Sequence, residues 1–287
     1  MNKKGERRIK KIVIAAMLLI VTGILLLMIN QKSRQNYVWK EEYENGVTVM
    51  EYQLSIYMDN PYMQDEYDQR IQSRRKETLE GFLEELDGLV RICIKNFGKD
   101  TGSQEEIYSQ AACILANNYE WRYMGNYEYF IHYEEDVEGQ WREFCSMIEE
   151  SGRPIDDKME LLWESAESYS TVNVEIYWLM SGAWEEEFYH CVDTIRTDVE
   201  ESNIEDKEKV LQALERYESF VGKWAEYNDT FAALDAPTAS GRFVVAEGRA
   251  QAFRTGTGIL LEHYRNAGRE YEFIYDYEKD RRYVEEW

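Results

Sequence analysis

Proline is almost absent from this chain. It occurs only three times in 287 residues, at positions 61, 154 and 237. Because proline interrupts helices, its scarcity leaves long stretches through which a helix can continue. Apolar residues recur in these stretches with a period of about 3.6 residues, and residues 46–57 are the only candidate for a strand. The sequence therefore predicts a mainly α fold, arranged as a helical bundle.

The helical segments are separated by recognisable end signals. Ser103 and Glu106 have the spacing of a capping box, and Gly152-Arg153-Pro154 predicts a break between two helices. We expect six segments: a basic cytoplasmic tail (1–11), a transmembrane signal anchor (12–29), a juxtamembrane segment (30–61), two helical subdomains (62–153 and 154–270) and an acidic aromatic tail (271–287).

Histidine is as rare as proline, and the common catalytic motifs are missing. Glu187 precedes His190 by three residues, but the second Glu-x-x-His step that a di-metal bundle site needs does not occur. Residues 254–258 (Arg-Thr-Gly-Thr-Gly) lack the lysine of a phosphate loop, so we interpret them as a flexible or small-residue packing segment. We expect no catalytic residues, no metal ion and no cofactor, and hence a protein that is not an enzyme.

Four cysteines occur, at spacings that match no zinc motif. Two interpretations stay open for Cys93, Cys113, Cys145 and Cys191. Their even number permits up to two disulfides in an oxidising compartment. Alternatively, cysteines on apolar helical faces, such as Cys93 and Cys191, serve as small hydrophobic residues.

Long apolar runs are also missing, with one exception. Residues 12–29 are apolar throughout apart from Thr22 and Gly23, and six basic residues precede them. A helix of this length would span roughly 27 Å, close to the hydrocarbon thickness of a bilayer. The run is longer than the core of a cleaved signal peptide and no small-x-small cleavage site follows it, so we expect an uncleaved anchor. The basic residues place the N-terminus in the cytoplasm and the remainder outside, as a single-pass protein of the cell membrane.

Positive charge is scarce beyond this anchor. Residues 1–34 carry a net charge of +7 and the whole chain carries −23, which leaves −30 on residues 35–287. So acidic a surface repels nucleic acid and anionic headgroups, and we expect neither as a partner of the outer domain. It attracts cationic partners, although the same charge also serves simply to keep a domain soluble.

Tyrosine and tryptophan, in contrast, are abundant, with 22 and 8 residues. They concentrate in residues 119–133 and 271–283. Such side chains combine rigid contact area with a polar tip, which suits recognition of a protein or glycan, but they also pack between helices. Trp121, Tyr123 and Tyr127 are candidate binding residues on the first interpretation.

Residues 184–264 carry a pattern of helices and loops with Trp184 at its start. A second helix begins at Leu211 and carries two aromatic residues three positions apart, Trp224 and Tyr227. A loop follows at Ser240-Gly241, and the last helix contains Arg254-Thr255 and Leu260-Leu261. This pattern resembles the LprI-type lysozyme-inhibitor domain of bacterial envelope proteins. The cysteines that staple the later helices of that family have no counterpart after Cys191. The resemblance implies a binding module for a lysozyme-like enzyme, with Trp184, Trp224 and Tyr227 as candidate binding residues.

Two functions from different classes follow from these patterns. The first is a membrane-anchored extracytoplasmic module that binds a lysozyme-like or other cationic envelope protein. The second is a structural or accessory subunit of a membrane complex, without catalytic activity.

Overall fold

The computed structural model describes residues 39–52, 66–123, 135–165, 170–235 and 241–285. Every regular element within these ranges is an α-helix, which confirms the mainly α fold. An unlabelled helix covers residues 39–52. It is followed by α2 (Glu66–Phe97), α3 (Thr101–Tyr123), α4 (Glu135–Ser165), α5 (Ser170–Glu201), α6 (Lys207–Asp235), α7 (Gly241–Asn266) and α8 (Tyr277–Glu285).

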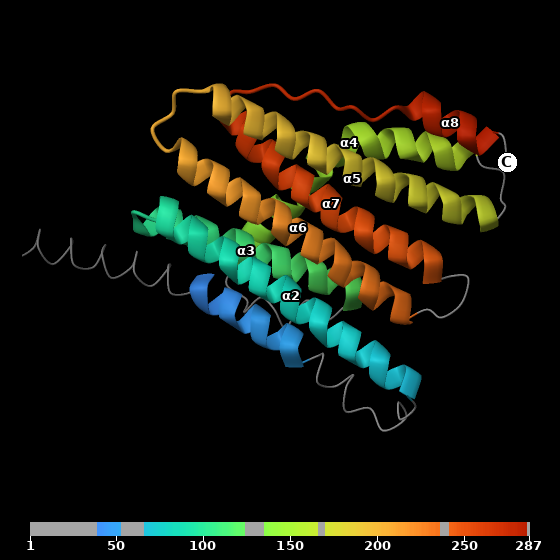
Figure 1. Cartoon of the computed structure of the whole chain (residues 1–287), viewed down its shortest axis with the longest axis horizontal. Helices are drawn as coiled ribbons and strands as arrows, with labels where there is room; N and C mark the ends of the chain where they lie inside the picture. The colour runs from blue at the N-terminus through green and yellow to red at the C-terminus, as the bar shows by residue number, and fades with distance from the viewer. Residues whose placement is uncertain (1–38, 53–65, 124–134, 166–169, 236–240, 286–287) are drawn as a thin grey trace, which may run out of the picture.

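Four long helices lie side by side in the order α2, α6, α7 and α5 (Figure 1). Behind this layer, α3 packs against α2, and α4 packs against α7 and α5. The short α8 lies against α4 and α5. The helix over residues 39–52 reaches α3, where the rings of Tyr43 and Tyr108 lie 5.9 Å apart.

The central helix of the bundle is α7, which is surrounded by protein on all sides. Residues 255–261 are all buried, and burial over nearly two consecutive turns requires neighbours in every direction. A Cβ atom on Gly256 would lie 2.9 Å from both methyl groups of Val221 and 3.3 Å from the ring of Phe188. One on Gly258 would lie 2.8 Å from Ile148. Small residues thus bring α7 close to α4, α5 and α6, which confirms the packing interpretation of residues 254–258.

An aromatic cluster joins α2 to α6. The ring of Phe82 stacks on Tyr227 at 5.2 Å and lies 5.7 Å from Phe220 and 6.2 Å from Trp224. All four side chains are buried. Aromatic pairs at such separations add stabilisation to that of the buried area itself, so this cluster fixes the position of α2 against the central layer.

The predicted helix break at residues 152–154 is wrong. Pro154 lies inside α4, which continues from Glu135 to Ser165. Because Pro154 is exposed, the carbonyl group of Glu150 that loses its helical donor can be hydrated instead. The predicted subdomain boundary at residue 153 therefore falls within a helix, and α2 and α6, from opposite sides of it, pack together.

Two other local predictions are also wrong. The cap of α3 is Asp100, whose Oδ1 accepts a hydrogen bond of 2.8 Å from the backbone N–H of Ser103, rather than a box of Ser103 and Glu106. Residues 46–52 of the candidate strand are helical, since Gly46 and Met50 belong to one buried helical face; the rest of that candidate lies outside the described residues.

The four cysteines are free thiols, and each is buried or half-buried. Burial raises the pKa of the Cys93 thiol to about 11 and that of the Cys113 thiol to about 12. The structure thus agrees with the interpretation in which the cysteines act as small hydrophobic residues.

None of the described helices is long and apolar enough to cross a membrane. The predicted anchor at residues 12–29 lies outside the described residues.

The close approach at Gly256 predicts a large difference between two glycine substitutions. Gly256→Ala places a methyl group against Val221 and Phe188, and we expect a loss of about 1–3 kcal/mol in the free energy of unfolding. Gly222→Ala on α6 meets no atom within 4 Å and improves helix propensity, so it should add ~0.5–1 kcal/mol. Denaturant unfolding followed by circular dichroism measures both; equal effects would contradict close packing at α7.

Candidate functional site

An extended strap, residues 269–276, connects α7 to α8 and runs along the edge of the bundle (Figure 1). It starts where Gly268 adopts a positive φ of 73°, a conformation that glycine reaches at no steric cost. The backbone N–H of Arg269 then donates to the carbonyl of Tyr264 (3.3 Å), which closes the end of α7. The chain is thereby turned back across α5.

The strap is held at its centre by Glu187 of α5, whose side chain is fully buried. The hydroxyl group of Tyr271 donates a hydrogen bond to Glu187 Oε1 at 2.5 Å, and the backbone N–H of Ile274 donates to Oε2 at 3.2 Å. Burial raises the pKa of the Glu187 carboxyl group, while these hydrogen bonds act in the opposite direction. Glu187 therefore serves as an anchor for the strap. Nowhere among the described residues do three His, Cys, Asp or Glu side chains gather as metal ligands would.

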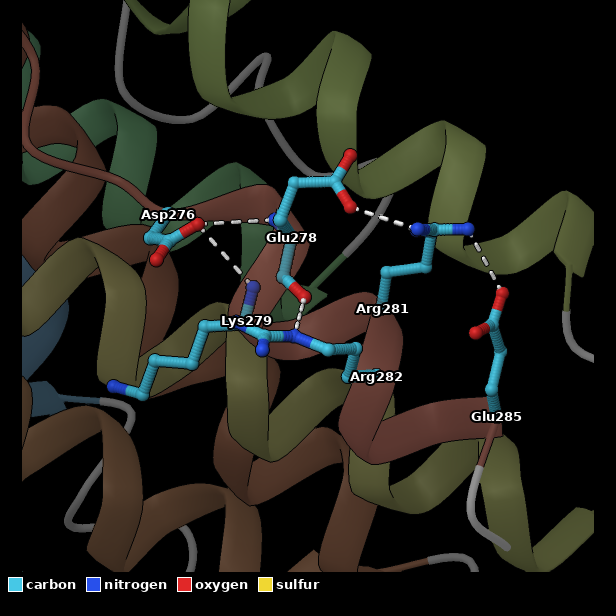
Figure 2. A network of polar contacts seen from close by, with 6 residues as sticks. All are labelled: Asp276, Glu278, Lys279, Arg281, Arg282 and Glu285. Carbon is cyan, nitrogen blue, oxygen red and sulfur yellow. Dashed lines mark hydrogen bonds and ion pairs between the residues drawn. The ribbon is translucent and has the colours of Figure 1, made fainter.

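α8 begins with a side-chain cap and carries its own ion pairs (Figure 2). Asp276 Oδ1 accepts hydrogen bonds from the backbone N–H groups of Glu278 (3.1 Å) and Lys279 (3.2 Å). Arg281 lies between two acids, 2.8 Å from Glu278 and 3.0 Å from Glu285. The cap satisfies donors that a helix start leaves free, and the pairs keep this short helix formed at the end of the strap.

An acidic groove lies between the N-terminal half of α5 and the strap with α8. Its volume is about 350 Å³. Its walls carry four acids, one base and several apolar or aromatic side chains; those used below are Glu175, Trp178, Glu186, Ile274, Asp276 and Tyr283. Trp178, Ile274 and Tyr283 are 41%, 49% and 42% exposed, although large apolar side chains are normally buried. Exposed aromatic side chains and carboxylates thus line the same hollow.

The wall of the acidic groove is fixed from beneath. Asp280 is buried, and burial raises the pKa of its carboxyl group, while a hydrogen bond from Tyr275 acts in the opposite direction. The ammonium group of Lys158 on α4 lies 5.7 Å from the centre of the Tyr275 ring, within the range of a cation–π contact. These contacts join the strap to α4 and α8, and α8 itself packs against α4 and α5, so the wall of the groove is fixed.

An apolar cavity opens at the other end of α5. It has a volume of about 630 Å³ and lies between α2, α3, α5, α6 and α7. Polar groups occur mainly at its mouth: Gln110 and His263 lie 3.3 Å apart, and Tyr264 donates a 2.7 Å hydrogen bond to Asp198. Burial and the Asp198 carboxylate raise the pKa of Tyr264 to about 12.

Of the six predicted binding residues, the three whose side chains the structure describes line neither the groove nor the cavity. Trp184, Trp224 and Tyr227 are 1%, 0% and 3% exposed and belong to the core. Trp224 and Tyr227 pack with Phe82, whereas the indole Nε1 of Trp184 is buried without a hydrogen-bond acceptor. A binding role for these three residues stays a prediction. Trp121 and Tyr123 belong to the last turn of α3, but their side chains, and the whole of Tyr127, lie outside what the structure describes.

The groove residues could be found only in part from the sequence. Tyr283 belongs to residues 271–283, one of the two segments in which tyrosine and tryptophan concentrate. Trp178 is separated from it by about a hundred positions and is one of eight tryptophans, so no local pattern connects the two. Only the return of the strap across α5 brings them to the same groove.

Comparison of this chain with protein-family models, with curated proteins and with solved structures gives no match in any of the three. The resemblance of residues 184–264 to the LprI-type domain therefore stays a resemblance of pattern.

Buried carboxyl groups predict that moderate acid stabilises the fold. Burial raises the pKa values of Glu187, Asp156, Asp229, Glu247 and Asp280. A folded state with raised carboxyl pKa values binds protons more tightly than the unfolded chain, so this stabilisation is complete below the unfolded pKa of about 4 and is lost as the pH rises through the folded values. The free energy of unfolding should therefore increase from pH 7.5 to pH 5.

Glu187→Gln provides the matched test. The amide oxygen can still accept the hydrogen bond of Tyr271, whereas the amide NH2 replaces the acceptor of Ile274. Because the amide does not titrate, the variant should show a shallower dependence on pH than the wild type. Thermal unfolding at constant ionic strength measures both slopes. A slope of opposite sign, or an unchanged slope in the variant, would count against the buried carboxyl as its origin.

Proposed function

We propose that this protein is a membrane-anchored binding module whose acidic groove binds a cationic partner outside the cytoplasm. The proposal rests on one observation: Trp178 and Tyr283 line the acidic groove together with carboxylates of α5 and the strap. Aromatic faces attract lysine and arginine side chains, and carboxylates give them charge-assisted hydrogen bonds. The two kinds of group together favour a basic protein surface over a neutral or acidic one.

The charge of the whole outer part supports the same class of partner. Residues 35–287 carry −30, and a surface of one sign accelerates encounter with a partner of the other sign. Lysozyme-like enzymes are the partner that the LprI-type resemblance implies, and a cationic lysozyme fits this charge. We therefore take lysozyme as the first protein to test.

Location at the membrane is part of the proposal. It rests on the apolar run at residues 12–29 and the six basic residues before it. An anchor in this orientation would expose the groove to the outside, where lysozyme-like enzymes and other cationic envelope proteins occur.

Substitutions in the groove should weaken lysozyme binding by the full-length protein in lipid nanodiscs. Trp178→Ala with Tyr283→Ala removes the aromatic surface, and we expect a loss of affinity of about tenfold or more, the usual scale of an aromatic hot spot. Tyr52→Ala removes a more exposed tyrosine of the helix over residues 39–52 and should have no effect. Biolayer interferometry measures the affinities.

The electrostatic part is tested separately. Glu175→Gln with Glu186→Gln should reduce affinity and weaken its dependence on salt, whereas Glu149→Gln with Glu150→Gln on exposed positions of α4 changes the net charge equally and should matter less. Equal effects of the two pairs would mean that the groove is not the site. No binding of lysozyme either at 50 mM salt, where screening is weaker, or at a physiological 150 mM would refute this partner. The accessory-subunit function would then be tested by cross-linking in membranes.

The anchor predicts how the chain fractionates. The wild type should stay with the membrane after an alkaline carbonate wash, and an external protease should reach residues beyond 38. Leu19→Arg with Leu26→Arg should release the chain, because each arginine deep in a transmembrane helix costs about 2–3.5 kcal/mol of insertion free energy. Ser33→Arg, outside the apolar run, is the control; release of the wild type would refute the anchor.

A further inference from the structure

The apolar cavity is too large to be a packing defect. Protein interiors are packed as densely as organic crystals, and voids much larger than a water molecule are few. At about 630 Å³ the cavity falls within the range of roughly 300–1,000 Å³ that is typical of small-molecule sites. It is partly open to solvent, so a ligand can enter.

The cavity is elongated along the helix axes. Its lining extends on α2 from Leu86 to Phe97 and on α3 from Ser103 to Ile114. Eleven residue steps at about 1.5 Å each give a length of roughly 16 Å along each helix. The deep part is aliphatic, formed by side chains such as Leu89, Val90 and Leu214. An elongated space with aliphatic walls fits an alkyl chain better than a planar ring system.

Two polar contacts join α3 to α7. Gln110 reaches His263 at 3.3 Å, and Asn117 reaches Thr255 at 3.4 Å. Small side chains, Ala111 of α3 and Ala213 of α6, also line the cavity and occupy little of its space.

The mouth is polar, which suits a ligand with one polar end. Arg269 Nη1 lies 3.5 Å from Asp198 Oδ2, and both residues line the mouth together with His263. Hydrogen-bond donors and acceptors here can bind a small headgroup, whereas the buried side chains of Leu89, Val90 and Leu214 offer none.

The source of an alkyl chain is indicated by the position of the first helix. Tyr43 of the helix over residues 39–52 contacts Tyr108, which lies on α3 between the cavity-lining residues Ile107 and Gln110. Nine residues, 30–38, separate this helix from the predicted anchor, and even fully extended they span only about 30 Å. An anchored chain therefore keeps the cavity within reach of the bilayer.

We propose that the apolar cavity binds a single alkyl chain of a membrane-derived amphiphile, with the polar end of that molecule at the mouth beside Gln110, His263 and Arg269. The alkyl-chain chemistry follows from the cavity alone, whereas its origin in the bilayer rests on the anchor of the proposed function.

Photo-crosslinking tests this with the full-length protein in nanodiscs. The probes are palmitic acid and a phosphatidylcholine, each with a diazirine in the middle of the acyl chain. Mass spectrometry of the digested protein should find both probes on peptides from residues 86–97 and 103–114. Ala213→Trp fills the cavity and should abolish this labelling, whereas Gln212→Trp on the exposed side of α6 should not. Val210→Phe, nearer the mouth, is a second filling variant, and circular dichroism verifies that each variant is helical.

The outcomes separate this proposal from the proposed function. Labelling of residues 12–29 by the phosphatidylcholine reports the anchor independently of the cavity. Labelling of the cavity by palmitic acid alone would support an alkyl-chain site and overturn its bilayer origin. Labelling that persists in both filling variants, or no labelling of the two peptides by either probe, would overturn the site.

Discussion

The close packing around α7 is the constraint on which the rest of this structure depends. Because Gly256 and Gly258 carry no side chains, Val221, Phe188 and Ile148 from three helices can contact the same stretch of backbone. Arg254 adds an ion pair of 2.8 Å to Asp156 of α4. With α4, α5 and α6 fixed in this way, the chain leaving α7 must return along the outer side of α5, and that return path builds the acidic groove.

The amphipathic helices could be predicted from their apolar periodicity, whereas α3 and α7 could be predicted only from signals near their ends, at Ser103 and at Ser240-Gly241. The stripe from Leu79 to Cys93 repeats every three or four residues because α2 has one buried and one solvated face. α3 has six consecutive buried residues, 111–116, and α7 has seven, so neither shows such a period. The prediction of a helix end at Pro154 is wrong because proline is tolerated at this exposed position, where solvent can replace the one lost hydrogen bond.

The candidate site was less predictable than the fold, because residue type does not state which face a side chain occupies. The LprI-type resemblance implies Trp184 and Trp224 as binding residues, yet both side chains are buried. The groove instead depends on contacts between distant positions, such as Glu187 with Tyr271, which are 84 residues apart. A carboxylate in the middle of an acidic helix resembles its solvated neighbours in the sequence. Only the strap that covers it makes it different.

The same strap contacts both candidate sites. Arg269 at one end lies at the mouth of the apolar cavity, and Ile274 and Asp276 at the other end line the acidic groove. A headgroup that drew Arg269 away from Asp198 would pull on the segment that forms the groove wall. Glu187 lies between the two ends and holds Tyr271 and Ile274 by buried hydrogen bonds, which cost more to break than exposed ones. Coupling between the two sites therefore requires the contact of Glu187 with the strap to have two states, formed and broken. While the hydrogen bonds of Glu187 stay formed, the cavity and the groove should respond to their ligands independently.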